Sequence, residues 1–434
     1  MFKMNLNRNY GAQRAPKAPN WAKTAVIYEV NTRQYTPEGT FRAFEAHLPR
    51  LKKLGVTVLW FMPIHPIGVE RRKGRLGSYY SVRDYLNVNP EFGTLNAFKR
   101  LVRKIHDMGM RVIIDWVANH SAWDNPILTA HPQWFRRNKA GEIVSPLPDW
   151  SDVADLNYNE TELRRYMTDA MLFWVRETDI DGFRCDVAEM VPTFFWKKAI
   201  HELRKIKPVL MLAEGQHPSL HVAGFHLSYA FNMYRLFNDI AAGLRSPYEI
   251  DKWLEIDRCN YPSGAMRLRY TCNHDQNSWT APAVIRLGDA ARVLAALTFT
   301  LPGTPLIYSG QEAGLSKSLA FFDKDTIDWQ ESPWFGFYQA LCNVRRRNPA
   351  LHGGTMVRLP DDNPEGAYSF VRQSGENQVL VAANLSTATV NGSIPSRGWS
   401  GTFIELFDNT RLQLGDRLDY SLPPWAFRIY LRER

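Results

Sequence analysis

The sequence predicts an α/β fold, a (β/α)8 TIM barrel with a short subdomain inserted after strand 3 and a C-terminal antiparallel β-sandwich domain. Short β-rich runs alternate with amphipathic helical stretches from Trp21 to Asn348, as in parallel strands that are joined by helices. Eight strand-and-helix pairs fit into this region, the number that closes such a barrel. After Pro349 the pattern changes to short alternating strands separated by turn residues, which indicates a small antiparallel β-domain.

The eight expected strands are short β-rich runs, of which the sixth has the weakest pattern. They span residues 26–31, 56–62, 112–117, 182–187, 209–213, 224–229, 269–272 and 305–308. The clearest helices between them span residues 41–54, 95–108, 160–176, 194–206, 290–300 and 335–347. The segments between the third and fourth strands are too long for one repeat of this pattern.

Asp115 and Asp186 lie 71 positions apart, whereas one strand-and-helix unit takes about 30 residues. An insertion of about 40 residues therefore follows the third strand, where barrels commonly grow. Its tryptophans and prolines predict a compact, turn-rich subdomain. The expected domains are a loose leader at 1–20, the barrel at 21–120 and 158–348, the inserted subdomain at 121–157 and the C-terminal β-domain at 349–434.

The chain is basic, with a formal net charge of +9, which raises nucleic acid or an anionic surface as partners. The Lys and Arg residues are scattered and no nucleic-acid-binding motif accompanies them, so a solvated basic surface is expected. No apolar stretch reaches the roughly 18 residues of a membrane span. The first residues lack the apolar centre of a signal peptide, and a secreted or periplasmic form with its signal removed would look the same as a cytoplasmic one.

Other catalytic chemistry has little support in the sequence. A GxSxG elbow, a glycine-rich phosphate loop, an HExxH motif and a dinucleotide fingerprint are all absent, so no organic cofactor is expected. The four cysteines have no CxxC or metal spacing. Because Cys185 and Cys272 lie on expected core strands, buried free thiols are expected and not a disulfide framework.

Charged and polar residues gather at the carboxyl ends of four expected strands, where a barrel carries its catalytic groups. They are Asp115, Asn119 and His120 on the third strand, Arg184 and Asp186 on the fourth, Glu214 on the fifth, and His274 and Asp275 on the seventh. A single carboxylate after a strand is often only a helix cap or a turn former. Three carboxylates from three strands, with two histidines and one arginine, would converge in one mouth.

The fourth strand carries Arg184 and Asp186 on one face, because alternate side chains of a strand point the same way. Charge on a buried strand is costly, which favours a functional site. A structural ion pair inside the barrel is the alternative that these residues alone leave open.

Paired carboxylates in different environments fit glycoside hydrolysis, in which one attacks the anomeric carbon and the other protonates the departing oxygen. Sugars also stack on flat aromatic faces. Five aromatic residues lie in loops that would surround the mouth: Tyr80, Trp123, Trp150, Phe231 and Trp279. Ordinary packing is the alternative for each of them.

With these residues in place, the chain resembles the α-amylase family of glycoside hydrolases, glycoside hydrolase family 13, from Trp21 to its end. The blocks that carry the resemblance occur in the family's order: GSYYSVRDY, DWVANH, VADLN, GFRCDVAEM, AEG and NHD. Each block alone is modest evidence, whereas six in order at barrel spacing are specific.

The resemblance implies a role for each matching residue. Asp186 would be the nucleophile, Glu214 the general acid and base, and Asp275 the third carboxylate, which favours a distorted sugar ring. Arg184 would keep Asp186 ionised, since a cation lowers the pKa of a carboxylate. His120 and His274 would contact the same glucose unit, and Tyr80 would stack beneath it. Asp115 would be a structural partner of Arg184.

The family commonly holds a calcium ion between the barrel and the insertion. Asn119 and Asp155 match two of its ligand positions, and oxygen ligands suit calcium. After the nucleophile, however, many relatives carry Lys-His, where this chain has Glu189 and Met190. This departure leaves both calcium and the preference on the leaving-group side of the cleft open.

The resemblance predicts a retaining hydrolase of α-1,4-linked glucans such as starch, or of maltooligosaccharides. A glucanotransferase or cyclomaltodextrinase-type enzyme of the same fold is the first alternative, because it would share the covalent intermediate. The second is a non-catalytic relative that binds sugars or assembles with partners. Such relatives typically lack one or more of the carboxylates, whereas this chain has all three. The sequence indicates neither the oligomeric state nor the compartment.

Overall fold

Eight parallel strands close into a barrel in the computed structural model, which describes residues 10–360, 362, 366–396 and 399–433. The strands follow one another around the barrel in the order β1-β10-β9-β8-β7-β6-β3-β2. Their bounds are β1 Ile27–Val30, β2 Val58–Phe61, β3 Arg111–Val117, β6 Gly182–Asp186, β7 Leu210–Ala213, β8 Leu227–Tyr229, β9 Met266–Arg269 and β10 Thr304–Tyr308. The barrel, with the C-terminal sheets described below, confirms the predicted fold class.

Apolar side chains fill the barrel on both sides of its strands. One cluster inside it includes Val58, Ile113, Leu212 and Leu268. Their neighbours on the same strands face outwards and pack against helices. Both faces of every strand are therefore buried, which is why these segments read as nearly continuous apolar runs.

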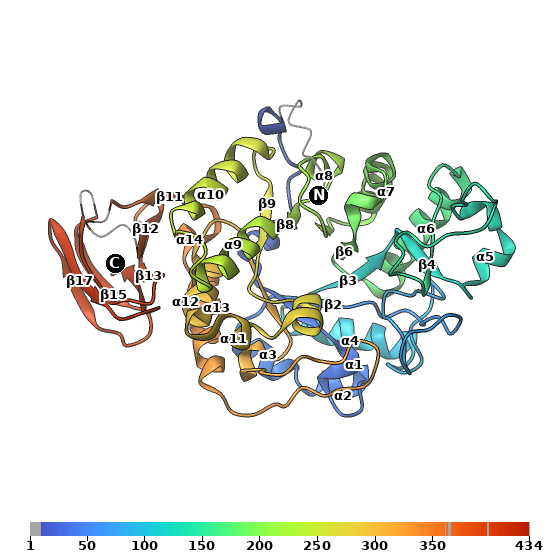
Figure 1. Cartoon of the computed structure of the whole chain (residues 1–434), viewed down its shortest axis with the longest axis horizontal. Helices are drawn as coiled ribbons and strands as arrows, with labels where there is room; N and C mark the ends of the chain where they lie inside the picture. The colour runs from blue at the N-terminus through green and yellow to red at the C-terminus, as the bar shows by residue number, and fades with distance from the viewer. Residues whose placement is uncertain (1–9, 361, 363–365, 397–398, 434) are drawn as a thin grey trace.

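Helices surround the barrel, as Figure 1 shows. Helix α4 illustrates how the sequence forms them: the Thr94 hydroxyl accepts from the Ala97 amide as an N-cap, and residues Phe98, Leu101, Val102 and Ile105 form its buried stripe. The α-helices are α1 Thr32–Tyr35, α2 Phe41–Glu45, α3 Leu48–Leu54, α4 Leu95–Asp107, α5 Pro126–Ala130, α6 Thr161–Thr178, α7 Thr193–Ile206, α8 Ser219–Ala223, α9 Phe231–Ala241, α10 Glu249–Asn260, α11 Ala283–Leu287, α12 Ala291–Thr300, α13 Pro333–Arg347 and α14 Pro349–Gly353.

The structure corrects the seventh expected strand and adds two helices before it. Strand β9 spans Met266–Arg269 and not 269–272, because Leu268 pairs with Thr304 of β10 and Met266 pairs with Leu227 of β8. Its two arginines, which hid the strand in the sequence, are neutralised by Asp257 of helix α10. Helices α9 and α10, between β8 and β9, were not expected.

Residues 118–160 leave the barrel between β3 and α6 and contain a two-stranded sheet, β4 His120–Ala122 and β5 Val153–Asp155. The segment also contains helix α5 and lies at one side of the barrel (Figure 1). Its backbone pairing sets His120 opposite Asp155. The insertion therefore begins at the carboxyl end of a barrel strand, beside the expected site.

At the opposite side of the barrel lies a C-terminal β-domain (Figure 1). One antiparallel sheet of the order β11-β12-β13-β18-β15-β16 faces a two-stranded sheet, β14-β17, across an apolar cluster. The bounds are β11 Thr355–Arg358, β12 Ala367–Ser374, β13 Asn377–Asn384, β14 Val390–Pro395, β15 Gly401–Glu405, β16 Arg411–Leu414, β17 Arg417–Leu422 and β18 Phe427–Arg432. Helices α12 and α14 of the barrel contact strand β13.

All four cysteines are free thiols, as predicted, and Cys185, Cys272 and Cys342 are buried. Cys259 is exposed because it lies on the outer face of the unexpected helix α10. Within the described ranges, none of the helices combines the length and apolar character that a membrane span requires.

Candidate active site

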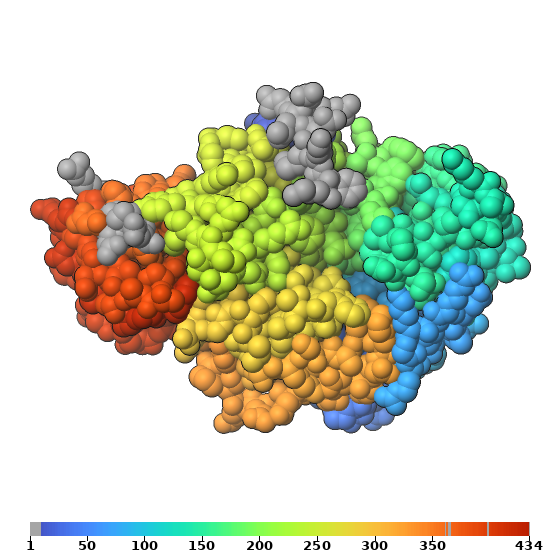
Figure 2. All heavy atoms as spheres, in the orientation of Figure 1, coloured from blue at the N-terminus to red at the C-terminus, as the bar shows by residue number. Residues whose placement is uncertain are grey.

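The three predicted catalytic carboxylates lie around one pocket of about 650 Å³ at the carboxyl end of the barrel. Strand β6 ends at Asp186, and strand β7 ends one residue before Glu214. Parallel pairing of Cys185 with Ala213 brings these two ends side by side. Asp275 comes from the loop that follows β9. Figure 2 shows the surface hollowed where the blue, teal, yellow and orange parts of the chain meet.

Arg184 lies beneath this pocket, fully buried, and binds three carboxylates. Its Nη1 donates to Asp115 Oδ1 and Asp186 Oδ1, each at 2.9 Å. Its Nη2 forms an ion pair with Glu214 Oε1, also at 2.9 Å. A single guanidinium therefore fixes the positions of Asp186 and Glu214 relative to each other. The ion pair that the sequence left as an alternative is present, and it joins two carboxylates that line the pocket, Asp186 and Glu214.

Three carboxylates share one guanidinium here, so its charge does not keep all of them ionised. Burial raises the pKa of Asp186 to about 6 despite the opposing charge of Arg184. Burial likewise raises the pKa of Glu214 to about 7, and nearby Asp186 and Asp275 add to this rise. Arg184 does lower the pKa of Asp186, as expected, but burial outweighs this attraction, so the net shift of the pKa is upward. Glu214 is the group that keeps its proton to higher pH.

His274 connects the pocket to a carboxylate that sequence reasoning missed. Its Nδ1 lies 2.5 Å from Glu29 Oε1, and its Nε2 lies 3.4 Å from Asp275 Oδ1. Burial favours the neutral ring, but Asp275 and Glu29 reverse this effect and raise the pKa of His274 to about 9. The imidazolium is therefore the form present at neutral pH. Glu29 carried a signal in the sequence, a single charge within the apolar run of β1.

Tyr80 and His120 line the pocket as predicted. The Tyr80 ring stacks on His274 with 5.3 Å between the ring centroids, and its hydroxyl lies 2.8 Å from His274 Nε2. Burial lowers the pKa of His120 to about 4, so this ring is neutral and serves as a hydrogen-bonding group. Its ring lies edge-on to Trp150, with 5.4 Å between centroids.

Two of the five expected aromatic residues do not line the pocket. Trp150 and Trp279 do, as does Tyr80, whereas Trp123 packs beneath the guanidinium of Arg71 and Phe231 begins helix α9. Phe321 and Phe322 take their place, from the loop between β10 and α13. The sequence held little signal for this pair, because the loop has no regular pattern and its approach to the pocket depends on the tertiary fold.

The tail of the GFRCDVAEM block acts on the neighbouring loop. Glu189 Oε1 accepts hydrogen bonds from the backbone amides of Gln216 and His217, just after Glu214. Gly215 has φ of +153°, and a Cβ there would lie 2.5 Å from the Glu189 side chain. Only glycine fits this close approach without displacement. Glu189, one of the two residues at which this chain departs from the family pattern, therefore supports the loop that carries Glu214.

Asn119 and Asp155, the predicted calcium ligands, lie outside the pocket and near each other in the β4–β5 region. The Asn119 side-chain amide lies 3.2 Å from His120 Nδ1, and the Asp155 carboxylate forms an ion pair with Arg136 at 3.3 Å. In the part of the chain that the structure describes, no three His, Cys, Asp or Glu side chains gather as a metal site would require. Arg136 already neutralises the Asp155 carboxylate, and a calcium ion at this place remains a prediction from the resemblance alone.

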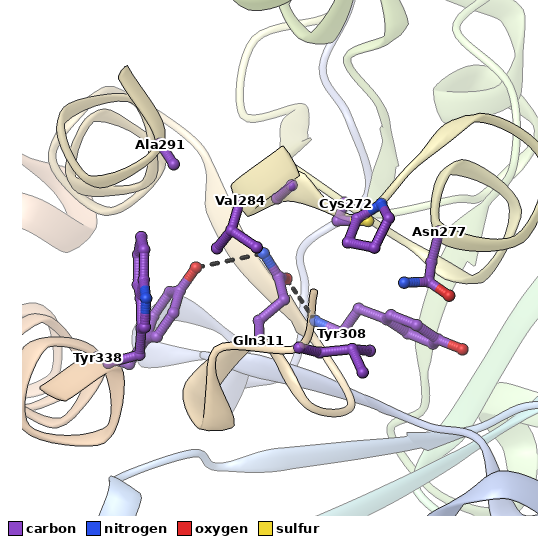
Figure 3. A pocket seen from close by; sticks show the side chains of 11 residues that line it. Cys272, Asn277, Val284, Ala291, Tyr308, Gln311 and Tyr338 are labelled. Atoms are coloured by element: carbon purple, nitrogen blue, oxygen red, sulfur yellow. Dashed lines mark hydrogen bonds between the residues drawn. The ribbon is translucent and has the colours of Figure 1, made fainter. Parts of the chain in front are cut away.

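A second pocket lies close to the site, behind strand β10 (Figure 3). Gln311 spans it, accepting from the Tyr308 amide at 2.8 Å and donating to the Tyr338 hydroxyl at 3.2 Å. Its volume of about 10 Å³ holds no more than roughly one water molecule. The hydrogen bonds of Gln311 support the end of strand β10, and the pocket is too small for a sugar.

Comparisons with known proteins agree with the fold and the pocket. Residues 16–142 and 147–211 match the catalytic domain of α-amylases, and residues 356–429 match the C-terminal domain of maltogenic amylases. The crystal structure of a noncanonic maltogenic α-amylase from Thermotoga neapolitana is 32% identical, with a TM-score of 0.87, over 94% of this chain and 98% of that one. An α-amylase from Lactobacillus plantarum is 28% identical, also with a TM-score of 0.87, over 96% and 100%.

Among curated relatives, α-amylase MalA from Haloarcula japonica is 26% identical over 90% of this chain, which spans 59% of that enzyme's length. A cyclomaltodextrinase from a Bacillus species is 27% identical over 85% of this chain and 74% of its own length. A pair of carboxylates at the mouth of a barrel is the arrangement that glycoside hydrolases use. The chain belongs to the α-amylase family of glycoside hydrolases, glycoside hydrolase family 13.

Proposed function

We propose that this protein is a retaining hydrolase that cleaves α-1,4-glucosidic bonds in starch-type glucans or maltooligosaccharides through a covalent glycosyl-enzyme intermediate. The observation that carries the proposal is the pair of carboxylates, Asp186 and Glu214, which the guanidinium of Arg184 holds at a pocket lined by aromatic and polar side chains. Carboxylates in retaining enzymes lie only about 5 Å apart, closer than in inverting ones, which need room for a water between them.

In the first step, an Asp186 oxygen attacks the anomeric carbon and the bond to the leaving oxygen breaks. Glu214 gives its proton to that oxygen, so the leaving sugar departs as a neutral alcohol. In the second step, Glu214 takes a proton from water, the resulting oxygen attacks the same carbon, and the bond to Asp186 breaks. Burial and the nearby carboxylates Asp186 and Asp275 raise the pKa of Glu214, which suits the group that must hold a proton for the leaving oxygen.

The other pocket residues would hold the sugar that Asp186 attacks. Asp275 and the cationic His274 present opposite charges within 3.4 Å of each other, suited to vicinal hydroxyls and to positive charge at the ring. Tyr80 offers an aromatic face, and the neutral His120 a further hydrogen bond. The named relatives include maltogenic α-amylase, cyclomaltodextrinase and neopullulanase, which supports small glucans as substrates.

The experiment that tests this function follows the products from starch, cyclodextrin, pullulan, maltotriose and maltoheptaose side by side. Proton NMR at the earliest times should show the new reducing ends in the α-configuration, and only chains shorter than the starting sugar should accumulate. Release of the β-anomer would contradict the retaining mechanism. Chains longer than maltoheptaose would favour the glucanotransferase alternative, which one curated relative, a cyclomaltodextrin glucanotransferase, represents.

A further inference from the structure

A second large cavity, of about 750 Å³, lies at the opposite end of the barrel from the active site. It is lined by Met266 and Thr304, the first residues of β9 and β10, and by Gly354 and Met356 at the start of the C-terminal domain. The catalytic carboxylates lie at the carboxyl ends of the strands, so no residue lines both cavities. The catalytic mechanism makes no use of this cavity.

Cationic side chains dominate the wall of this cavity. Lys23 and six arginines line it, together with three acidic residues. Each acidic residue is already paired: Asp257 with Arg267 and Arg269, Asp251 with Arg358, and Glu255 with Arg258. The two remaining arginines, Arg345 of α13 and Arg372 of β12, have no carboxylate partner among the described residues.

Arg345 and Arg372 are both buried, at 2% exposure, and their side-chain hydrogen bonds among the described residues go to backbone carbonyls. Arg345 Nη2 donates to Gly303 O at 2.7 Å, and Arg372 donates to Thr300 O at 2.7 Å and to Gly354 O at 3.1 Å. Three of their other nitrogens have no hydrogen-bond partner among the described residues: Nε and Nη1 of Arg345, and Nε of Arg372. Nη1 of Arg269, which also lines the cavity, likewise has none. Four buried nitrogens with unused N–H groups thus belong to residues that line one cavity, and such groups are costly to leave unpaired.

The electrostatics of these residues agree with the geometry. Burial lowers the pKa of Arg345 to about 9, and the nearby positive charge of Arg372 adds to this effect. Burial also lowers the pKa of Arg372 to about 10. Two like charges held together in a buried place would each gain from an anion between them. The planar fork of arginine suits the oxygens of a phosphate or carboxylate.

We propose that this cavity, the basal cavity, is a binding site for a phosphorylated small molecule of about the size of a sugar phosphate, held by Arg345 and Arg372. Two unpaired cations match a dianion better than a monoanion. The volume lies within the range of about 300–1,000 Å³ that small-molecule sites occupy, larger than a free phosphate ion needs. The site goes beyond the proposed hydrolase function and does not depend on it.

Isothermal titration calorimetry of the full chain in a chloride buffer tests this proposal with four probes: glucose 1-phosphate, inorganic phosphate, glucuronate and glucose. We expect saturable one-to-one binding of glucose 1-phosphate, weaker binding of inorganic phosphate and glucuronate, and no effect of glucose at this site. Tighter binding of inorganic phosphate than of the sugar phosphate would overturn the assigned ligand size. Absence of saturable binding by both phosphates would overturn the site and leave the arginines with a structural role.

The variants Arg345→Gln and Arg372→Gln should each weaken glucose 1-phosphate binding at least tenfold. Arg347→Gln is the matched control, because Arg347 lies on the same helix α13 but is exposed. Equal affinity in all four proteins would show that the phosphate binds elsewhere. Hydrogen exchange of the wild-type protein, which needs no variant to fold, should slow on ligand addition in peptides that contain Arg345 or Arg372, and protection confined to other segments would overturn the location.

Discussion

The backbone amide of Val187 donates to Glu214 Oε2 at 2.7 Å, so the residue that follows Asp186 in the chain holds the carboxylate opposite it. Val187 has φ of 35°, in the left-handed region that a β-branched residue rarely enters. The turn out of β6 thus aims an N–H group at Glu214 while Arg184 binds both carboxylates. The position and the protonation of Asp186 and Glu214 are therefore set together.

The first prediction concerns pH. Activity requires Asp186 without its proton, so kcat/KM should rise as pH rises through about 6. Activity also requires Glu214 with its proton, so kcat/KM should fall as pH rises through about 7. Because the two carboxyl groups interact, the two apparent pKa values of this pH profile belong to the pair and not to either residue alone. The measurement is kcat/KM for maltotriose from pH 4 to 9.

A matched experiment separates the limbs. Glu214→Gln should retain part of its activity on a maltoside with an aryl leaving group of low pKa, which needs little protonation. With that substrate, the falling limb near pH 7 should disappear. A variant that kept this limb would show that another group is the general acid.

The second prediction concerns the nucleophile. Asp186→Asn should lower kcat by at least about 10³-fold, since loss of a nucleophile removes the covalent route. Maltooligosaccharide binding, measured by calorimetry, should stay within a few-fold of the wild type, and the circular dichroism spectrum should be unchanged. Near wild-type turnover would exclude Asp186 as the nucleophile.

The barrel and the carboxylates of the site were predictable because they depend on local patterns. Strands β3, β6 and β7 have strong apolar runs, and the charges at their ends break those runs at the places where the site forms. The predicted position of strand β9 was wrong by three residues, because Arg267 and Arg269 resemble surface residues in the sequence. Their neutralisation by Asp257 is a tertiary contact that no local pattern reveals.

The rest of the site depends on contacts between segments far apart in the chain. Glu29 meets His274 across 245 positions, and Phe321, from the loop after β10, stacks on Tyr80, from the loop after β2. The basal cavity is a similar case, because Arg345 and Arg372 come together only when the C-terminal domain packs on the barrel. Sequence patterns predict helices and strands well, whereas contacts between residues far apart in the chain become visible only in the complete fold.

The third prediction concerns the loop after Glu214. Glu189→Ala removes an exposed carboxylate that accepts two hydrogen bonds, from the amides of Gln216 and His217, and a typical hydrogen bond contributes about 1 kcal/mol. We expect kcat to fall roughly tenfold as Glu214 loses its support, with a fall in Tm of a few degrees. Glu189→Gln keeps one acceptor oxygen and should lie between the two proteins.

The control for this change is Glu202→Ala, which removes a surface carboxylate that forms an ion pair with Lys205 three positions away. Its kcat should equal that of the wild type, because exposed pairs contribute little. Equal losses of activity in both variants would contradict a specific role for Glu189. The assay is initial rate on maltotriose, with Tm from differential scanning calorimetry.

The fourth prediction concerns His274. Glu29→Gln removes one of the two carboxylates that raise the pKa of His274, so this pKa should fall below about 9. NMR titration of the imidazole, assigned by its loss in His274→Gln, gives the value directly. We expect KM to rise in Glu29→Gln above pH 7 as the ring loses its proton. An unchanged pKa would show that Asp275 alone sets the charge of His274.

The fifth prediction concerns the junction between the insertion and the barrel. Because Arg136 already neutralises Asp155 at 3.3 Å, and the described residues offer no cluster of His, Cys, Asp or Glu ligands there, chelation by EDTA should leave Tm and activity unchanged.

Arg136→Ala leaves the half-buried Asp155 without its cation, and the pKa of this carboxyl, already raised to about 6 by burial, should rise further. Stability of this variant should therefore fall with rising pH between about 4 and 8, more than in the wild type, because the unfolded chain releases the proton first. Scanning calorimetry of both proteins across this range, with and without added calcium, checks the sign. A large fall in Tm on adding EDTA to the wild type, reversed by calcium, would show that a metal ion holds this junction after all.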